Sequence, residues 1–167
     1  VDINPIVATL APGLTKSKGN TAGLKGSKTS ALEGGVRVPA SIWWQGVIED
    51  SATDQFMFVQ DLLPTLLTAA GIEIDKSVSF DGSDKWENLV NDEITPPDND
   101  FVGSQIVFDE RALYKDEWKL HFRKPAMFPG SNGTYSLFNI IDDPFETKDL
   151  SMIELKVFED MTRYMQS

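Results

Sequence analysis

The sequence predicts an α/β protein in which a small antiparallel sheet is covered by a C-terminal helix. Three observations support this class. An apolar and β-branched run, VRVPASIWW, precedes a helix-like stretch, DLLPTLLTAAG. Three strand-like runs follow after residue 100, and the chain ends in an amphipathic pattern typical of a helix. The 167 residues, 41% of them hydrophobic, suffice for one ordinary domain core or for part of a larger one.

The first strand and the first helix are expected in the N-terminal half. Residues 36–44 have little polar interruption, so we expect a strand that is buried on both faces. The helix over residues 61–71 has Asp61 as its N-cap and Pro64 in its first turn, where a missing N–H does no harm. Gly71 is expected to end it. The expected apolar face consists of Leu62, Leu63, Leu66, Leu67 and Ala70.

The C-terminal half predicts an antiparallel sheet and a helix that lies on it. The strand-like runs are SQIVFDERALY, EWKLHF and TYSLFNI, with Lys115-Asp116 as the turn between the first two. In the tail, Ser151 and Glu154 have the spacing of a capping box, so the helix is expected to begin at Ser151. Its apolar stripe would comprise Ile153, Val157, Phe158, Met161, Tyr164 and Met165.

The charge balance and the cysteine count exclude several classes of function. The chain has 15 basic and 26 acidic residues, and its net charge of -11 argues against nucleic acid or an anionic membrane as the main partner. No stretch approaches the roughly 18 apolar residues of a membrane span. The absence of cysteine excludes disulfides, thiolate metal sites and a cysteine nucleophile within this chain.

Most candidate catalytic and metal-binding features have a simpler structural explanation. The single histidine, His121, lies in an alternating WKLHF run, where a role in the strand is favoured over that of a catalytic base. One histidine without cysteine does not make a zinc site, and DGSDKWENLVND lacks the spacing of a calcium loop. Residues 132–134, Asn-Gly-Thr, match a glycosylation acceptor, but Asn-Gly also favours a turn, which we prefer.

The segment LKGSKTSALEGGVRVPA, residues 24–40, combines the features of an anion-binding loop. Its glycines allow the backbone to approach a ligand closely, and Lys28 can bring an ammonium group to an anionic oxygen. On composition alone, however, solvated surface lysines remain the favoured interpretation.

Five segments follow one another in the chain, namely LKGSKTSALEGGVRVPA, DLLPTLLTAAG, FDG, RALYKDEWKL and LFNIIDDPFETKDL. Their order resembles the C-terminal part of a formylglycine-dependent sulfatase of the arylsulfatase family, and this resemblance favours a functional role for the lysines. The resemblance implies an alkaline-phosphatase-like fold, to which residues 36–44 and 61–71 contribute the last strand and helix of a large mixed sheet. It also implies two parts: residues 1–100, the C-terminal end of the catalytic α/β domain, and residues 101–167, a small subdomain with the antiparallel sheet and the final helix.

The same resemblance implies roles for single residues. Lys28 matches the family's active-site lysine, which binds the sulfate group of the substrate, and Lys25 stands where the family usually has an arginine. The residues expected to shape and support the loop are Glu33, Gly34, Gly35 and Arg37. Arg111 and Trp118 would contribute to the substrate cleft, although strand packing and a surface charge explain them equally well.

Other parts of such an enzyme are expected outside this chain. The formylglycine nucleophile arises from a Cys/Ser-x-Pro/Ala-x-Arg motif, which is absent here, and no metal ligand is expected in this chain, so calcium would be held elsewhere. We therefore interpret the chain as a fragment of a sulfuric ester hydrolase. It would be inactive alone and would act on a sulfated glycan or aryl sulfate together with an N-terminal catalytic portion. Members of the family are commonly secreted, periplasmic or lysosomal.

Two alternatives remain open from the sequence. The first is a phosphodiesterase or phosphonate hydrolase of the same superfold, because a cation beside an anionic ester serves both chemistries. The second is a non-catalytic, sulfatase-like module that binds sulfated glycans. In either enzyme, we expect the loops at residues 73–100 and 124–134 to determine substrate specificity, because loops on a fixed scaffold carry such differences.

Overall fold

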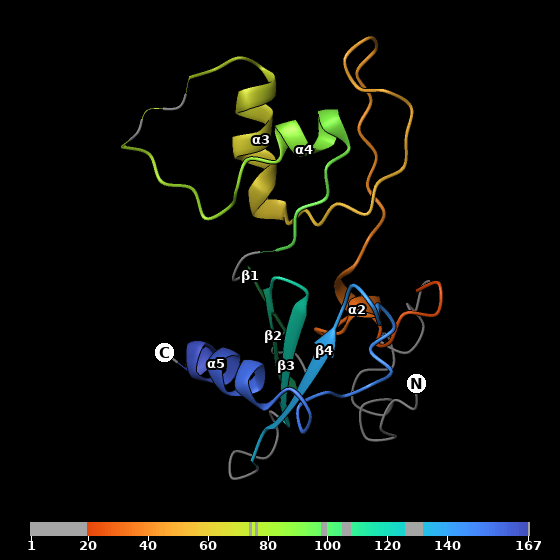
Figure 1. The fold of residues 1–167 in the computed structure, drawn as a ribbon, viewed down its shortest axis with the longest axis vertical. Helices are drawn as coiled ribbons and strands as arrows, with labels where there is room; N and C mark the ends of the chain where they lie inside the picture. Colours follow the sequence, from red (N-terminus) through yellow and green to blue (C-terminus); the bar gives the residue numbers. More distant parts are fainter. Residues whose placement is uncertain are drawn as a thin grey trace. The chain divides into compact units, whose positions relative to one another are not determined.

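The computed structural model of the chain describes residues 20–73, 75, 77–97, 100–104, 108–125 and 132–166. These residues form two compact units (Figure 1). Residues 20–39 and 100–166 make up the first, and residues 40–97 make up the second. Residues 24–39, here called the lysine loop, thus belong to the same unit as the C-terminal sheet. The predicted division of the intact protein at residue 100 stays a prediction.

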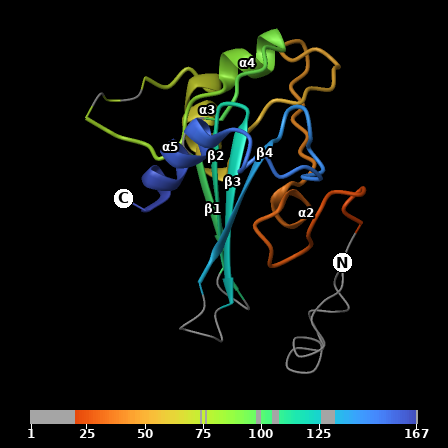
Figure 2. The ribbon, with the colours of Figure 1, turned by 60° about the horizontal axis from the view of Figure 1, so that its bottom comes forward.

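A four-stranded antiparallel meander forms the centre of the first unit (Figures 1 and 2). Its strands are, in order, β1 (Asp100–Ser104), β2 (Phe108–Lys115), β3 (Trp118–Pro125) and β4 (Thr134–Asn139). The sequence analysis predicted three of these strands and missed β1. The turn between β2 and β3 is Asp116-Glu117, one residue later than predicted, because Asp116 adopts the left-handed φ of +52° that a tight hairpin needs.

Helix α5 (Leu155–Gln166) covers one face of this sheet, as predicted. Leu113, Leu120 and Leu137 are register partners on three neighbouring strands, and they form a buried cluster with Met161 of the helix. Trp118, Tyr135, Val157, Phe158 and Met165 pack around this cluster. Burial of these apolar side chains is the main favourable contribution to the stability of the unit.

The helix begins later than the capping-box spacing indicated, so that prediction was wrong. The carbonyl group of Leu150 accepts hydrogen bonds from the N–H groups of Ile153 and Glu154, which closes a separate turn before the helix. The N–H of Ser151 donates instead to the carboxylate of Asp149. As a result Ile153, which was expected on the apolar stripe, is 62% exposed.

The opposite face of the sheet is polar and meets the lysine loop. Neighbouring residues of a strand point to opposite faces, so Glu110 and Tyr114 of β2 and Lys119 and His121 of β3 face away from α5. The loop contributes a single helical turn, α2 (Glu33–Val36), on this side. Figures 1 and 2 show α2 and α5 on opposite sides of the sheet.

The second unit is built on three short helices, namely the 3-10 turn η1 (Val59–Asp61), α3 (Leu62–Ala69) and α4 (Trp86–Asn91). The predicted helix over residues 61–71 is therefore confirmed. The carboxylate of Asp61 accepts from the N–H groups of Phe58 (2.8 Å) and Ser83 (2.7 Å), and not from α3 itself. The hydroxyl of Thr65 accepts from the N–H of Lys85 (2.9 Å), so the FDGSDK segment is fixed against the start of α3.

The strand predicted at residues 36–44 is not formed in this structure. The segment beyond α2 has irregular backbone, and Val38 (76%) and Trp43 (82%) are exposed. A buried strand needs hydrogen-bonded neighbours, and among the described residues none pairs with this segment. Three of the four leucines expected on the apolar face of α3 are also exposed, including Leu63 (56%) and Leu66 (54%). The large mixed sheet of the intact protein stays a prediction.

No helix in the described part of the chain combines the length and the apolar character that crossing a membrane requires.

The leucine cluster makes the stability of the first unit testable. Leu137→Ala should lower the free energy of unfolding by about 2–5 kcal/mol, because the strand cannot close the cavity that a fully buried leucine leaves. Leu155→Ala, at a position that is 54% exposed, is the matched control and should cost much less. Urea unfolding followed by tryptophan fluorescence measures both. Equal losses for the two variants would contradict the assigned core.

Candidate anion-binding site

The lysine loop is wound around two glycines. The N–H of Gly34 donates to the carbonyl oxygen of Lys25 at 2.7 Å. A Cβ atom at Gly34 would lie 2.7–2.8 Å from the backbone oxygens of residues 24–26, and one at Gly35 would lie 2.2 Å from the carbonyl oxygen of Ser30. Only glycine leaves room for the backbone of the loop at these two positions, which explains the Glu-Gly-Gly sequence.

Lys28 lies at the exposed end of this loop. Two residues with left-handed φ flank it, Gly26 at +86° and Thr29 at +81°, so the backbone turns sharply on both sides of the lysine. Within the described residues, Lys28 makes no hydrogen bond or ion pair. Lys28 is thus exposed and unpaired within the part of the chain that the structure describes, while the backbone beneath it is closely packed.

Lys25 has a different environment from Lys28. Its Nζ donates to the carbonyl oxygen of Glu146 at 2.9 Å and lies 5.1 Å from the centre of the Phe138 ring. These contacts attach the first arm of the loop to β4 and to the turn that follows it. Of the two lysines that the sequence singled out, one is used in an internal contact and the other is not.

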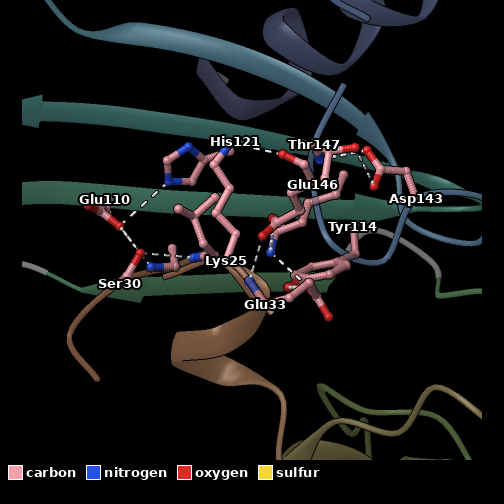
Figure 3. Close-up of polar contacts among 12 residues, drawn as sticks. Lys25, Ser30, Glu33, Glu110, Tyr114, His121, Asp143, Glu146 and Thr147 are labelled. Atoms are coloured by element: carbon pink, nitrogen blue, oxygen red, sulfur yellow. Dashed lines mark hydrogen bonds and ion pairs between the residues drawn. The ribbon is translucent and has the colours of Figure 1, made fainter. Parts of the chain in front are cut away.

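Three charged side chains and a tyrosine from distant segments meet beneath the loop (Figure 3). Lys119 Nζ lies 2.8 Å from both Glu33 Oε1 and Glu146 Oε1, and its side chain is fully buried. The hydroxyl of Tyr114 donates to Glu33 Oε1 at 2.7 Å, and the N–H of Glu33 donates to Glu146 Oε2 at 2.9 Å. This group, here called the Lys119 network, joins the loop to β2, to β3 and to the turn after β4.

In the Lys119 network, each buried charge depends on the opposite charges beside it. Two carboxylates share one ammonium group in a buried place, where an unpaired charge is strongly unfavourable. Burial, together with the nearby charge of Glu33, raises the pKa of Tyr114 well above its usual value, and the phenol therefore stays a proton donor. The positive charge of Arg37 acts on the pKa of Tyr114 in the opposite direction. The side chains of the network are thus joined by short contacts in a place closed to solvent.

A third buried carboxylate, that of Glu110, holds the loop a few residues earlier. Its Oε2 accepts from Ser30 Oγ and from the N–H of Ala31, both at 2.8 Å, and its Oε1 lies 3.0 Å from Arg123 Nε. His121 Nε2 lies 3.5 Å from Oε2 (Figure 3). Burial acts to raise the pKa of Glu110, but hydrogen bonds from His121, Ala31 and Ser30 hold it below its usual value.

The DDPFETKDL segment after β4 is folded so that Glu146 points under the loop. The carboxylate of Asp143 accepts from the N–H groups of Thr147 (2.7 Å) and Lys148 (2.8 Å), which closes the turn around Glu146. Glu146 itself has a left-handed φ of +55°, an uncommon conformation for a residue with a side chain. The carboxylate reaches Lys119 and Glu33 from this turn.

Arg111 and Trp118, which were expected to contribute to a substrate cleft, lie on the other face of the sheet. Arg111 pairs with Asp109 at 3.0 Å and its guanidinium lies 5.9 Å from the centre of the Phe122 ring. Trp118 packs against the leucine cluster under α5. The structure therefore does not bring these two residues together with Lys28 in the first unit, and their role in substrate binding stays a prediction.

The sequence analysis did not single out Lys119, Glu146, Tyr114 or Glu110. One signal was available: polar residues alternate with apolar ones in WKLHF, so a polar face of that strand follows from the period of two, whereas the consecutive polar residues of FDER give no such pattern. Which loop covers that face depends on contacts between distant segments, and no local pattern contains that information.

The described residues contain no group of three or more His, Asp or Glu side chains that could hold a metal ion. The ligand set that calcium requires is thus not found among them.

The sequence of the chain is similar to those of sulfatases. The sequence model of the Sulfatase family matches residues 11–72. An uncharacterized sulfatase of Schizosaccharomyces pombe is 28% identical over 153 residues, which cover 86% of this chain and 27% of that protein. Arylsulfatase A of Bos taurus is 32% identical over 110 residues, which cover 64% of this chain and 22% of the relative. The chain therefore spans about a quarter of the length of these two relatives.

A solved structure supports the same fold. It comes from work on the metabolism of multiple glycosaminoglycans by Bacteroides thetaiotaomicron, and it superposes with a TM-score of 0.68 over 87% of this chain and 32% of that one. At 16% identity this likeness concerns the fold alone. Together, the matches show that the chain is similar to a C-terminal portion of sulfatases.

The close packing around the two glycines can be tested by substitution. Gly35→Ala should force the loop away from Ser30 and lower the free energy of unfolding by about 1–3 kcal/mol. Gly46→Ala is the control, because a Cβ there meets nothing within 4 Å and the cost is only that of its φ of +77°. The N–H groups of Ser30 and Gly34 donate to the carbonyl oxygens of Ser27 and Lys25, so their amide hydrogen exchange should accelerate in the first variant alone. Unchanged exchange at both amides would contradict the proposed packing.

The lowered pKa of Glu110 predicts an acid-sensitive loop. Because this pKa is lower in the folded chain than in the unfolded chain, ionised Glu110 stabilises the fold above its ordinary value of 4.5. That stabilisation is lost as the pH falls through the lowered pKa. Exchange of the Ala31 amide, corrected for its intrinsic rate, should therefore accelerate between about pH 5 and pH 3. In Glu110→Gln this pH dependence should disappear, and its persistence would show that another group controls the loop.

Proposed function

We propose that the chain supplies the anion-binding lysine of a sulfuric ester hydrolase. The observation that carries the proposal is Lys28, an exposed ammonium group without a partner among the described residues, on a loop wound tightly around two glycines. A sulfate ester is anionic, and its leaving oxygen gains negative charge in the transition state. A cation held at that position stabilises the developing charge. Similarity to the Sulfatase family supports this chemistry over that of an unrelated anion site.

The residues around Lys28 have supporting roles in this proposal. Lys25 holds the loop and adds positive charge beside the substrate. The residues that shape and support the loop are Glu33, Gly34, Gly35 and Arg37. Arg111 and Trp118 remain candidates for the substrate cleft of the intact enzyme.

The other chemical groups of the reaction belong to the N-terminal catalytic portion of the intact enzyme. Formylglycine supplies the nucleophile in such enzymes and calcium neutralises sulfate oxygens, as the resemblance implies. The described residues do not provide the ligands for calcium, and we assign them no step that passes through it. Alone, the chain binds at most the sulfate group and does not hydrolyse the ester.

The substrate is a sulfated glycan or an aryl sulfate in this proposal. The loops at residues 73–100 and 124–134 would distinguish between such esters. The intact protein would act in a secreted, periplasmic or lysosomal location, as is common in the family.

The proposal is tested in the intact enzyme with an aryl sulfate as substrate. Lys28→Ala should lower kcat/KM by about 10²–10³-fold, because it removes the cation beside the leaving oxygen. Lys28→Arg keeps the charge but changes its geometry, so it should retain part of the activity. Lys115→Ala removes an exposed lysine of β2 and should leave kcat/KM unchanged.

The outcome also separates the alternatives. An unchanged kcat/KM in Lys28→Ala would refute the assignment. A wild-type preference for phosphodiesters over sulfate esters would favour the phosphodiesterase. Salt-sensitive binding of sulfated glycans without turnover, weakened by the same substitution, would favour a non-catalytic module.

A further inference from the structure

We infer that Lys119 is a positioning residue for Lys28: its buried ammonium group, held between Glu33 and Glu146, fixes the anion-binding loop on the C-terminal sheet. The catalytic consequence rests on the function proposed above. The structural part concerns the loop alone and can be tested without any activity.

A short chain of contacts connects the two lysines. Lys119 Nζ binds Glu33 at 2.8 Å, and Glu33 is followed directly by Gly34, whose N–H binds the carbonyl oxygen of Lys25 at 2.7 Å. Lys28 is carried by the backbone that passes over these glycines without a gap. A displacement of Glu33 would therefore move the backbone that carries Lys28.

The charge of Lys119 is what allows Glu33 and Glu146 to lie together. Both carboxylates are buried, at 3% and 0% exposure, and each lies 2.8 Å from the same ammonium group. Without that group two like charges would face each other in a place closed to water. Tyr114 is a neutral donor and does not neutralise either one. Glu33 would then move toward solvent and take α2 with it, because an uncompensated buried charge is strongly unfavourable.

The effect of losing Lys119 is expected to be local. The leucine cluster and α5 lie on the other face of the sheet and make no use of Lys119. Glu110 still holds Ser30 and Ala31 through its own hydrogen bonds. The sheet should thus keep its fold while the loop loses the ion pair between Glu33 and Lys119 and keeps its contacts with Glu110.

Limited digestion with trypsin measures the order of the loop directly, because its own lysines are the cleavage sites. In the wild-type chain, the wound backbone should protect the bonds after Lys25 and Lys28. Lys119→Met should make cleavage there about tenfold faster or more, while the circular dichroism of the helices stays unchanged. Lys115→Met is the matched control, since it makes the same substitution at an exposed position of the same hairpin.

A second substitution tests the charge argument. Glu146→Gln added to Lys119→Met removes one of the two uncompensated carboxylates, so it should restore part of the protection. Unchanged protection in Lys119→Met, or no recovery in the double variant, would overturn the inference.

Kinetics of the intact enzyme separate positioning from general stability. If Lys119 acts through Lys28, then Lys119→Met should lower kcat/KM about tenfold in the wild-type background and leave it unchanged in Lys28→Ala. An equal loss in both backgrounds would show a structural role only and would overturn the inference. If Lys28→Ala itself has no effect, the proposed function fails, and the trypsin experiment still decides whether Lys119 orders the loop.

Discussion

The arrangement of the first unit depends on one buried ion-pair network, in which Lys119 serves two glutamates. Glu33 and Glu146 are 113 residues apart in the sequence, and the backbone of one donates to the carboxylate of the other. An unpaired charge is costly in such a place. The loop, the sheet and the turn after β4 therefore depend on one another, because each contributes a charged side chain to the network. A network of this kind contributes less to net stability than to a unique arrangement of segments, and this arrangement determines where the exposed lysine stands.

The five segments that carry the family resemblance come together in two sets of contacts. Glu-Gly-Gly, Trp-Lys-Leu and Asp-Asp-Pro-Phe-Glu meet in the Lys119 network of the first unit. Asp-Leu-Leu-Pro-Thr and Phe-Asp-Gly meet in the second unit, where Asp61 binds the N–H of Ser83 and a Cβ at Gly82 would lie 2.3 Å from the backbone of Gln60. Gly34, Gly35 and Gly82 serve backbone geometry, whereas Lys28 is exposed and has no partner among the described residues.

Local periodicity predicted much of the fold, since strands β2 to β4 and helices α3 and α5 follow patterns of two or of three to four residues. The errors lie where distant segments decide the outcome. Residues 36–44 have the composition of a strand but no partner among the described residues, and Ser151 binds Asp149 where a helix cap was expected. In the site, the resemblance led to Lys25 and Lys28, but only the structure shows that Lys25 Nζ donates to the carbonyl oxygen of Glu146, whereas Lys28 has no partner among the described residues.

Neighbouring residues of β3 have different roles because they point to opposite faces of the sheet. Trp118 and Leu120 pack under α5, whereas Lys119 and His121 face the loop. Alternate positions of one strand therefore contribute to the apolar core and to the contact with the loop. Substitution of the apolar residues by others of similar volume would leave the loop in place. A shift of the strand by a single residue would exchange the two roles and lose both at once.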